Sequence, residues 1–164
     1  MFDIQVMNYR SAFDFIYNNS YLDNNLKFAI ISIQDGPNNE MGFSYKKGGN
    51  CLEALNLWFS DVTEMGYQEA KKNKNNYLKL ISDSDAKKIK EFVDKLYSLD
   101  IDLLIIHCRA GQSRSAGVAA ALSQVIYGDD SEFFNNPRYT VNMTVYYKVL
   151  KAFGYDMRQS FEDI

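Results

Sequence analysis

One stretch of the sequence decides the fold: HCRAGQSRS, at residues 107–115. An apolar run at residues 101–106 precedes it, and an alanine-rich segment at residues 113–127 follows it. The run is typical of a central parallel strand, and the alanine-rich segment is typical of a packed helix. The stretch therefore joins the end of a buried strand to the start of a helix, which is where open α/β sheets bind their ligands.

The spacing within this stretch suits the binding of a phosphate group. Five residues between Cys108 and Arg114 can curl into a loop whose amides point inward at one anion, and Gly111 permits the tight turn. Arg114, on the first helical turn, can hold two phosphate oxygens with its planar guanidinium. Cys108 lies at the base of the loop, where the helix dipole and the amides favour the thiolate. Ser115 can hydrogen-bond the sulfur and stabilise it as a leaving group.

The stretch resembles the signature of the cysteine-based protein tyrosine phosphatases: His-Cys, five residues, Arg, then Ser or Thr. Every fixed position is present, and HCRAGQSRS looks most like the compact dual-specificity branch; the resemblance covers residues 50–127. It implies hydrolysis of phosphotyrosine, and of phosphoserine or phosphothreonine, in proteins through a cysteinyl-phosphate, with no metal or other cofactor. The implied catalytic residues are Cys108, Arg114, Asp61 and Ser115. The implied substrate-binding residues are Arg109, Ala110, Gly111, Gln112 and Ser113.

His107 has two readings. In one reading it pairs with Cys108 as in a cysteine protease, but neighbouring strand residues point to opposite faces, so His107 is poorly placed to serve as the base. The resemblance implies instead that His107 faces away from the substrate and supports the loop through hydrogen bonds.

Ester cleavage also needs a proton donor for the leaving oxygen. The resemblance places an aspartate on a loop after an upstream strand, and Asp61 fits that position. Asp83 and Asp85 are nearer to Cys108 in the sequence, but their place ahead of Ala86 also predicts helix capping. We favour Asp61, and we expect the polar segment at residues 63–76 to be a lid or insert that accounts for its long separation from Cys108.

The rest of the chain alternates strands with helices. Strands are expected at residues 3–8, 27–33, 51–59 and 101–106, with a turn at 35–38. Helices are expected at residues 10–17, from a cap at Asp83 or Ser84 to Tyr97, at 113–127, and at 142–153, where Gly154 ends the last one. Residues 61–76 predict a loop with a short helix near 68–72. The pattern predicts an α/β fold, a central mostly parallel sheet flanked by helices, in one phosphatase-like catalytic domain of residues 1–164.

Composition limits the classes of partner and the cellular compartment that we expect for the chain. The net charge of −3 speaks against a general nucleic-acid binder. The N-terminus lacks a signal-peptide pattern, and no segment has the roughly 18 apolar residues of a membrane span. Two cysteines fit a reducing compartment, and a single histidine leaves only weak options for a metal site. We expect a cytoplasmic protein that acts on a phosphorylated protein, without a nucleic-acid or membrane partner.

Three residues have two readings each. Cys51 is either a core residue or the partner of Cys108 in a protective disulfide. Asn142 either caps the last helix or also braces the phosphate-binding loop. Arg109 either faces solvent and selects acidic substrates or is an ordinary loop residue.

Other functions share the same loop. A phosphatase for phosphoinositides or RNA 5′-phosphates is one alternative, although Ala110 and Gln112 stand where such relatives tend to carry lysine or another histidine. A phosphate-binding pseudophosphatase is a second, and the intact Cys108, Arg114 and Ser115 count against it. A sulfur transferase is a distant third.

Overall fold

The sheet of the molecule has four parallel strands in the order β1-β4-β2-β3. The computed structural model describes residues 1–18, 25–36 and 44–156. The strands are β1 (Asp3–Met7), β2 (Phe28–Gln34), β3 (Cys51–Trp58) and β4 (Leu103–His107). The two central strands, β2 and β4, are buried along their whole length, as their continuous apolar sequences predict. The expected α/β fold with a parallel sheet is confirmed.

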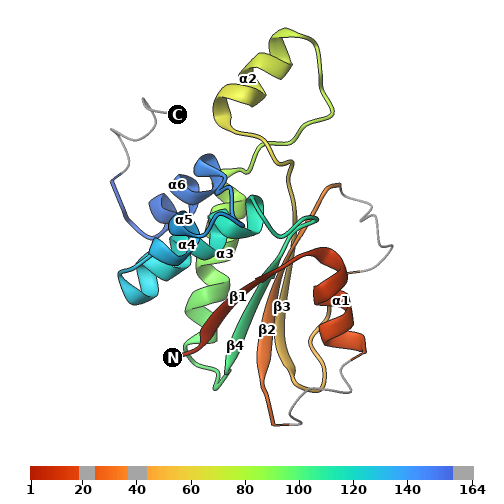
Figure 1. The fold of residues 1–164 in the computed structure, drawn as a ribbon, viewed down its shortest axis with the longest axis vertical. Coiled ribbons are helices and arrows are strands. Elements are labelled where there is room, and N and C mark those ends of the chain that lie inside the picture. The colour runs from red at the N-terminus through yellow and green to blue at the C-terminus, as the bar shows by residue number, and fades with distance from the viewer. Residues whose placement is uncertain (19–24, 37–43, 157–164) are drawn as a thin grey trace.

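The register brings the carboxyl ends of three strands to one edge of the sheet. Met7 of β1 and Ser32 of β2 both stand opposite His107, the last residue of β4. Whatever follows these strands is therefore gathered around the start of the stretch that begins at Cys108 (Figure 1).

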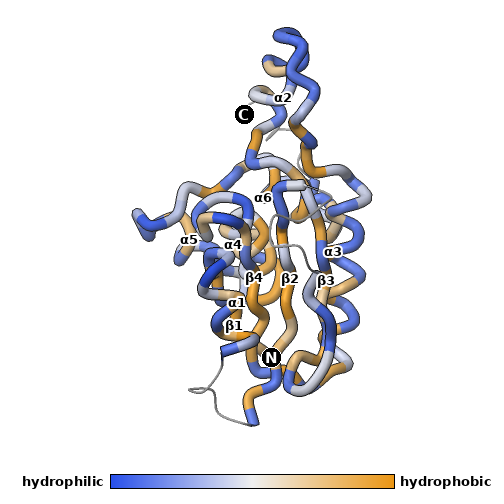
Figure 2. The backbone as a smooth tube through the Cα atoms, turned by 90° about the vertical axis from the view of Figure 1, so that its right-hand side faces the viewer, coloured by the Kyte–Doolittle hydropathy of each residue, from blue (hydrophilic) through white to orange (hydrophobic). Residues whose placement is uncertain are grey.

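Helices cover both faces of the sheet. They are α1 (Tyr9–Tyr17), α2 (Glu64–Lys72), α3 (Asp83–Leu96), α4 (Arg114–Tyr127), α5 (Ser131–Asn135) and α6 (Met143–Ala152). The larger core cluster lies between the sheet and α3, α4 and α6, and the smaller one lies beneath α1 (Figure 1). Hydrophobic colour runs along the central strands in Figure 2, whereas α2 is mostly hydrophilic.

The N-terminus of α3 differs from the sequence prediction. Neither Asp83 nor Ser84 caps the helix; Ser82 does. The Ser82 hydroxyl accepts from the Asp85 amide at 3.0 Å, and the Asp85 carboxylate accepts from the Ser82 amide at 2.9 Å. This reciprocal pair satisfies two amides that a helix start leaves open. The predicted apolar face is buried through Leu96, but Tyr97, which follows the helix, is mostly exposed.

Small residues let α4 approach its neighbours. Ala116, Ala119, Ala120 and Ala121 are fully buried. At Gly117, an added Cβ would lie 2.9 Å from the carbonyl oxygen of Asn142 and 3.0 Å from the Val145 side chain. The glycine thus permits a close contact between α4 and the start of α6.

The segment that follows Asp61 is more ordered than the sequence predicts. Helix α2 covers residues 64–72 instead of a short helix near 68–72, and the Thr63 hydroxyl caps it by accepting from the Gly66 amide at 3.2 Å. No residue of α2 is buried, and the helix projects away from the body (Figure 1). The sequence did not predict the full helix because α2 has no buried face, so its apolar residues do not recur with the 3.6-residue spacing of a packed helix.

The predicted turn at residues 35–38 is only partly described, and one short helix was not predicted. Residues 37 and 38 of the expected turn lie outside the described residues. Helix α5 has no counterpart among the sequence predictions. Within the described part of the chain, no helix is both long enough and apolar enough to cross a membrane.

Candidate active site

The phosphate loop, residues 108–114, begins where β4 ends and finishes on the first residue of α4. Three of its carbonyl oxygens accept from amides outside it, at 2.9–3.2 Å: Arg109 from Tyr9, Gln112 from Thr140, and Ser113 from Asn142. The amides of residues 110–113, by contrast, have no acceptor among the described residues. Backbone amides that lack an acceptor, in a loop whose carbonyl oxygens bond to other segments, are typical of loops that bind anions.

Gly111 is the tightest point of the loop. Its φ is +67°, in the left-handed region that favours glycine. An added Cβ would lie 2.7 Å from the Asn8 nitrogen and 2.7 Å from the Met7 carbonyl carbon. The predicted need for glycine is confirmed, with a further reason: the loop rests directly on the junction between β1 and α1.

Cys108 lies at the base of the loop and is 2 % exposed. Its Sγ is 3.0 Å from the hydroxyl of Ser115, which is fully buried. The predicted hydrogen bond between these two groups is therefore present.

His107 makes its contacts on the other side of the strand end. Its Nε2 lies 2.7 Å from the Ser32 hydroxyl, and its Nδ1 lies 3.2 Å from the carbonyl oxygen of Cys108. Neither ring nitrogen contacts Sγ, so the geometry disagrees with a protease-like pair. Burial lowers the pKa of His107 to about 4, and the ring is neutral at pH 7. The supporting hydrogen bonds predicted for His107 are present.

Arg114 is buried and held from two directions. Its Nη1 donates to the Phe59 carbonyl at 2.9 Å and pairs with Asp35 Oδ1 at 2.6 Å. Its Nε is buried without a partner among the described residues. The protein thus fixes the guanidinium through Nη1. The Nε–H has no partner among the described residues and can donate to an anion.

Asp35 is a site residue that the sequence did not reveal. It follows the last residue of β2, and its second oxygen, Oδ2, is 3.5 Å from Arg109 Nη1. One carboxylate therefore touches both arginines of the loop. An acidic residue directly after a buried parallel strand could have indicated a site residue. Asp35 also fits the turn predicted at residues 35–38, and that explanation was sufficient. Arg109 is largely exposed, and its role in substrate choice stays a prediction.

Of the three acid candidates, only Asp61 contacts the phosphate loop. Its Oδ1 accepts from the Ser113 hydroxyl at 2.7 Å. Asp85 is occupied by Lys79 at 2.8 Å and by the cap of α3, and Asp83, 76 % exposed, pairs with Lys148 at 3.2 Å. Position thus favours Asp61 as the proton donor.

Asn142 joins the acid to the rest of the site. Its side-chain oxygen accepts from the Val145 amide at 3.1 Å and caps α6, while its Nδ2 donates to Asp61 Oδ1 at 3.0 Å. Its backbone amide holds the Ser113 carbonyl. Both predicted roles of Asn142 are present together, and the bond to Asp61 is an additional one.

Cys51 is remote from the site. It opens β3 opposite Phe28, which also stands opposite Leu103 of β4, so Cys51 is level with a residue five positions before Cys108. Five strand residues span roughly 16 Å, whereas a disulfide needs Cα atoms within about 7 Å. The disulfide alternative is wrong, and Cys51 is a core residue whose pKa is raised to about 11 by burial.

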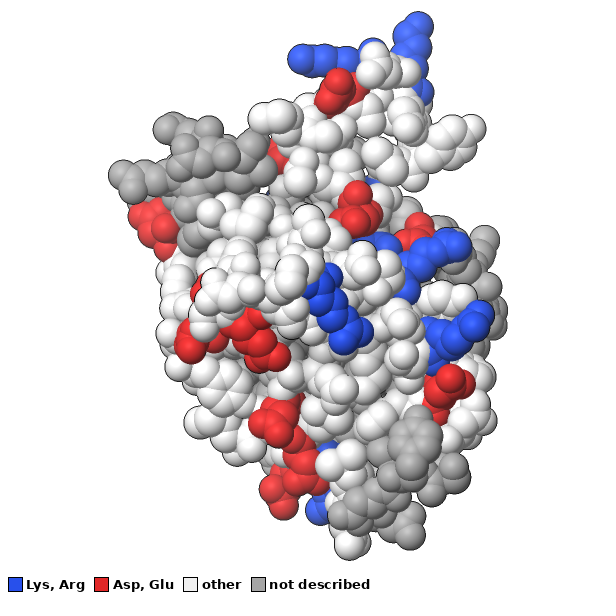
Figure 3. Space-filling model, viewed as in Figure 1, with Lys and Arg blue, Asp and Glu red and all other residues white. Residues whose placement is uncertain are grey.

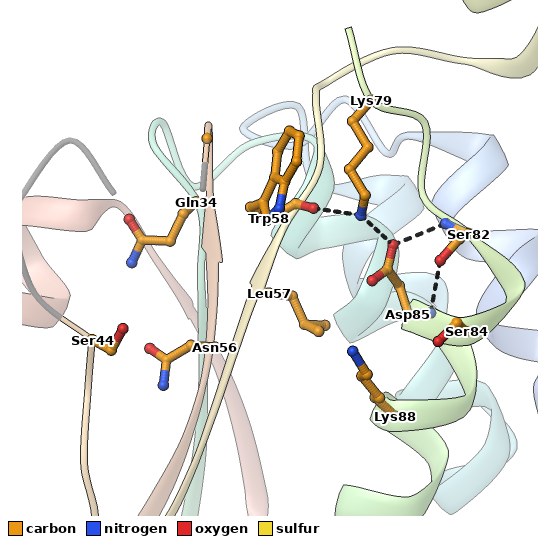
Figure 4. Close-up of a pocket in the computed structure, with 11 residues that line it drawn as sticks. Gln34, Ser44, Asn56, Leu57, Trp58, Lys79, Ser82, Ser84, Asp85 and Lys88 are labelled. Atoms are coloured by element: carbon orange, nitrogen blue, oxygen red, sulfur yellow. Dashed lines mark hydrogen bonds and ion pairs between the residues drawn. The ribbon is translucent and has the colours of Figure 1, made fainter. Parts of the chain in front are cut away.

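A polar hollow of about 450 Å³ lies beside the loop at the ends of β2 and β3 (Figure 4). Lys79 crosses it, donating to the Trp58 carbonyl and to Asp85, both at 2.8 Å. No residue of the phosphate loop lines this hollow, so it is distinct from the anion site. Within the described ranges, no three His, Cys, Asp or Glu side chains lie together as metal ligands would.

Comparison with known proteins gives likeness in structure only. No protein-family model matches the chain, and no curated protein sequence matches it. Several solved structures, among them the following three, are similar to it in fold. The human tyrosine phosphatase-like serine/threonine/tyrosine-interacting protein is 17 % identical, with a TM-score of 0.58 and 98 % of this chain and 91 % of that one covered. DUSP15 is 15 % identical, with a TM-score of 0.56 and coverage of 99 % and 92 %.

The third, PTPMT1 in complex with PI(5)P, is 16 % identical, with a TM-score of 0.54 and coverage of 92 % and 89 %. At identities this low, the comparisons show a shared fold only, and the similarity extends over nearly all of each chain. The molecule therefore has the fold of the cysteine-based protein tyrosine phosphatases and resembles their compact dual-specificity branch.

Proposed function

We propose that this protein is a cysteine-dependent phosphomonoester hydrolase of the protein tyrosine and dual-specificity type, with residues 1–164 as one catalytic domain. One observation carries the proposal: Cys108 Sγ lies beneath a loop whose amides and whose Arg114 Nε are unpaired among the described residues, with Asp61 at the rim. A nucleophile, an anion clamp and an acid are thus assembled around one space.

In the first step, the Cys108 thiolate attacks phosphorus and forms an S–P bond. The bond from phosphorus to the ester oxygen breaks, and that oxygen leaves with the proton of Asp61. In the second step, Asp61 takes a proton from water as the water oxygen attacks phosphorus. The S–P bond breaks, its electron pair returns to sulfur, and Ser115 stabilises the thiolate.

The groups around the phosphate stabilise its negative charge. The amides of the loop and Arg114 hold the equatorial oxygens, where negative charge gathers in both transition states. Asp35 and the Phe59 carbonyl fix the orientation of the guanidinium, so little reorganisation is needed when the phosphate arrives.

Two alternatives use the same loop. The bound PI(5)P of PTPMT1 supports a phosphatase for non-protein phosphates, including phosphoinositides and RNA 5′-phosphates. The "phosphatase-like" relative supports a binding module without turnover. The substrate panel in the test below distinguishes these alternatives from the protein phosphatase.

The test is hydrolysis of p-nitrophenyl phosphate, a phosphotyrosine peptide, PI(5)P and a 5′-phosphorylated RNA, with EDTA present. We expect wild type to hydrolyse the first two, Cys108→Ser to be inactive, and Asp61→Ala to be slowed about 100-fold on the peptide, whose leaving group needs a proton. Turnover of PI(5)P or RNA alone would transfer the proposal to those substrates. Binding of phosphate without any turnover would identify a binding module instead.

A further inference from the structure

The segment after Asp61 leaves the body and returns just before Ser82; we call residues 62–80 the arm (Figure 1). The hydrogen bonds that hold its base include three at 2.7–3.3 Å: Asn142 Nδ2 to the Val62 carbonyl, the Glu64 amide to the Thr144 hydroxyl, and the Ser60 amide to the Lys79 carbonyl. The arm is therefore fixed at the point where it joins the acid Asp61.

Beyond its base, the arm is covered by little of the described protein. Helix α2 contributes no buried residue, Met65 is 64 % exposed and Tyr77 is 94 % exposed. A nine-residue helix is marginal by itself in water and normally depends on a packed face. A capped helix that adds nothing to the core, yet starts three residues after the acid, offers its surface to another molecule.

The outer end of the arm is basic. Lys71 and Lys72 end α2, and Lys74 follows in a left-handed conformation, with φ +58°. No acidic side chain in the described ranges pairs with any of the three. The presence of Lys71 and Lys72 in the last turn is explained by their favourable interaction with the helix dipole. That explanation does not extend to Lys74, which lies beyond the helix. Figure 3 shows basic side chains at this end of the molecule.

We propose, resting on the phosphatase function above, that the arm binds an acidic segment of the phosphorylated protein substrate. Glu64 and Glu69 of the arm precede the three lysines, so its outer end, residues 71–77, carries only positive charge on a chain whose net charge is −3. A short acidic segment can reach this surface without approaching the acidic residues of the body. A long polyanion such as RNA would also face those acidic residues and be repelled.

The length of the arm sets the position of the acidic residues. Nine helical residues rise about 13 Å, and an extended peptide rises about 3.3 Å per residue. We therefore expect the acidic group about four residues from the phosphorylated one. A substrate as small as p-nitrophenyl phosphate cannot reach the lysines, and its hydrolysis is independent of them.

The test compares two phosphotyrosine peptides, one with three glutamates and one with three glutamines at the same positions, centred about four residues from the phosphotyrosine. Each pair is made once with these residues before the phosphotyrosine and once with them after it. At low salt we expect wild type to prefer the acidic peptide by about tenfold in kcat/KM, mainly through KM, and to lose the preference at about 0.5 M NaCl. Lys71→Glu/Lys72→Glu/Lys74→Glu should reverse the preference and leave p-nitrophenyl phosphate hydrolysis unchanged.

The matched control replaces three exposed lysines elsewhere, Lys46, Lys87 and Lys151, by glutamate and should keep the preference. Equal hydrolysis of both peptides by wild type, or an unchanged preference in the arm variant, would overturn the inference while activity on p-nitrophenyl phosphate upholds the phosphatase. A preference that also disappears in the control would assign it to overall charge and reject the arm. No activity on any substrate would refute the proposed function itself.

Discussion

The phosphate loop and the arm are neighbours at Asp61, yet they are built in opposite ways. In the loop, the outward carbonyls, the cysteine sulfur and one side of Arg114 each have a protein partner, and the backbone at Gly111 touches another strand end. The arm is bonded at its base, and its helix buries nothing. The groups that we propose to surround phosphorus are therefore held by many contacts, whereas the surface that we propose to select among substrates has few.

The largest expected effect comes from exchanging a glycine in each region. Gly111→Ala places a Cβ 2.7 Å from backbone atoms in a left-handed conformation, and we expect it to lower the free energy of unfolding by about 4 kcal/mol and to abolish turnover. Gly66→Ala in α2 meets only a 3.2 Å side-chain contact and gains helix propensity, so it should change stability by less than about 1 kcal/mol. Urea denaturation of both variants measures the difference; equal losses would contradict the contrast.

A second effect depends on pH and arises at His107, the strand residue that precedes the loop. Because burial lowers the pKa of His107 from 6.5 to about 4, the unfolded chain binds a proton in this window that the native state does not. Stability from this group is intact above pH 6.5 and falls by about 3 kcal/mol as the pH drops to 4.

Denaturation of wild type and His107→Asn from pH 7 to pH 4 isolates this contribution. The variant is expected to be less stable at pH 7 but to lose about 3 kcal/mol less than wild type over the interval. Parallel stability profiles would show that His107 is not buried in its neutral form.

The smallest expected effect concerns the support of Arg114. Asp35→Ala removes the carboxylate 2.6 Å from Nη1, and we expect kcat/KM for p-nitrophenyl phosphate to fall about tenfold because the guanidinium is less well oriented. Asp35→Asn, which keeps a hydrogen-bond acceptor, should recover part of the loss. Full activity of the alanine variant would show that the Phe59 carbonyl alone positions the arginine.

The loop was predictable from sequence because its requirements are local. Strand, glycine, arginine and serine stand at fixed distances along the chain, and each residue type has a geometric reason. Asp61 was found by its place after a strand. Asp35 was not, because its contact with Arg114 depends on how β2 lies against β4, and no local pattern contains that register. The cap at Ser82 was not predicted, although Ser82 and Asp85 form the pattern Ser-x-x-Asp, because the neighbouring Asp83 and Ser84 are residue types that also cap helices.

Gly117 has a consequence that extends beyond packing. It allows α4 to touch the carbonyl of Asn142, and Asn142 in turn holds the carboxylate of Asp61. The separation between Asp61 and Cys108 thus depends partly on how closely α4 and α6 approach. In the proposed mechanism, a buried glycine remote from the substrate would act as a spacer, and substitutions in the interior of the protein would alter the reaction.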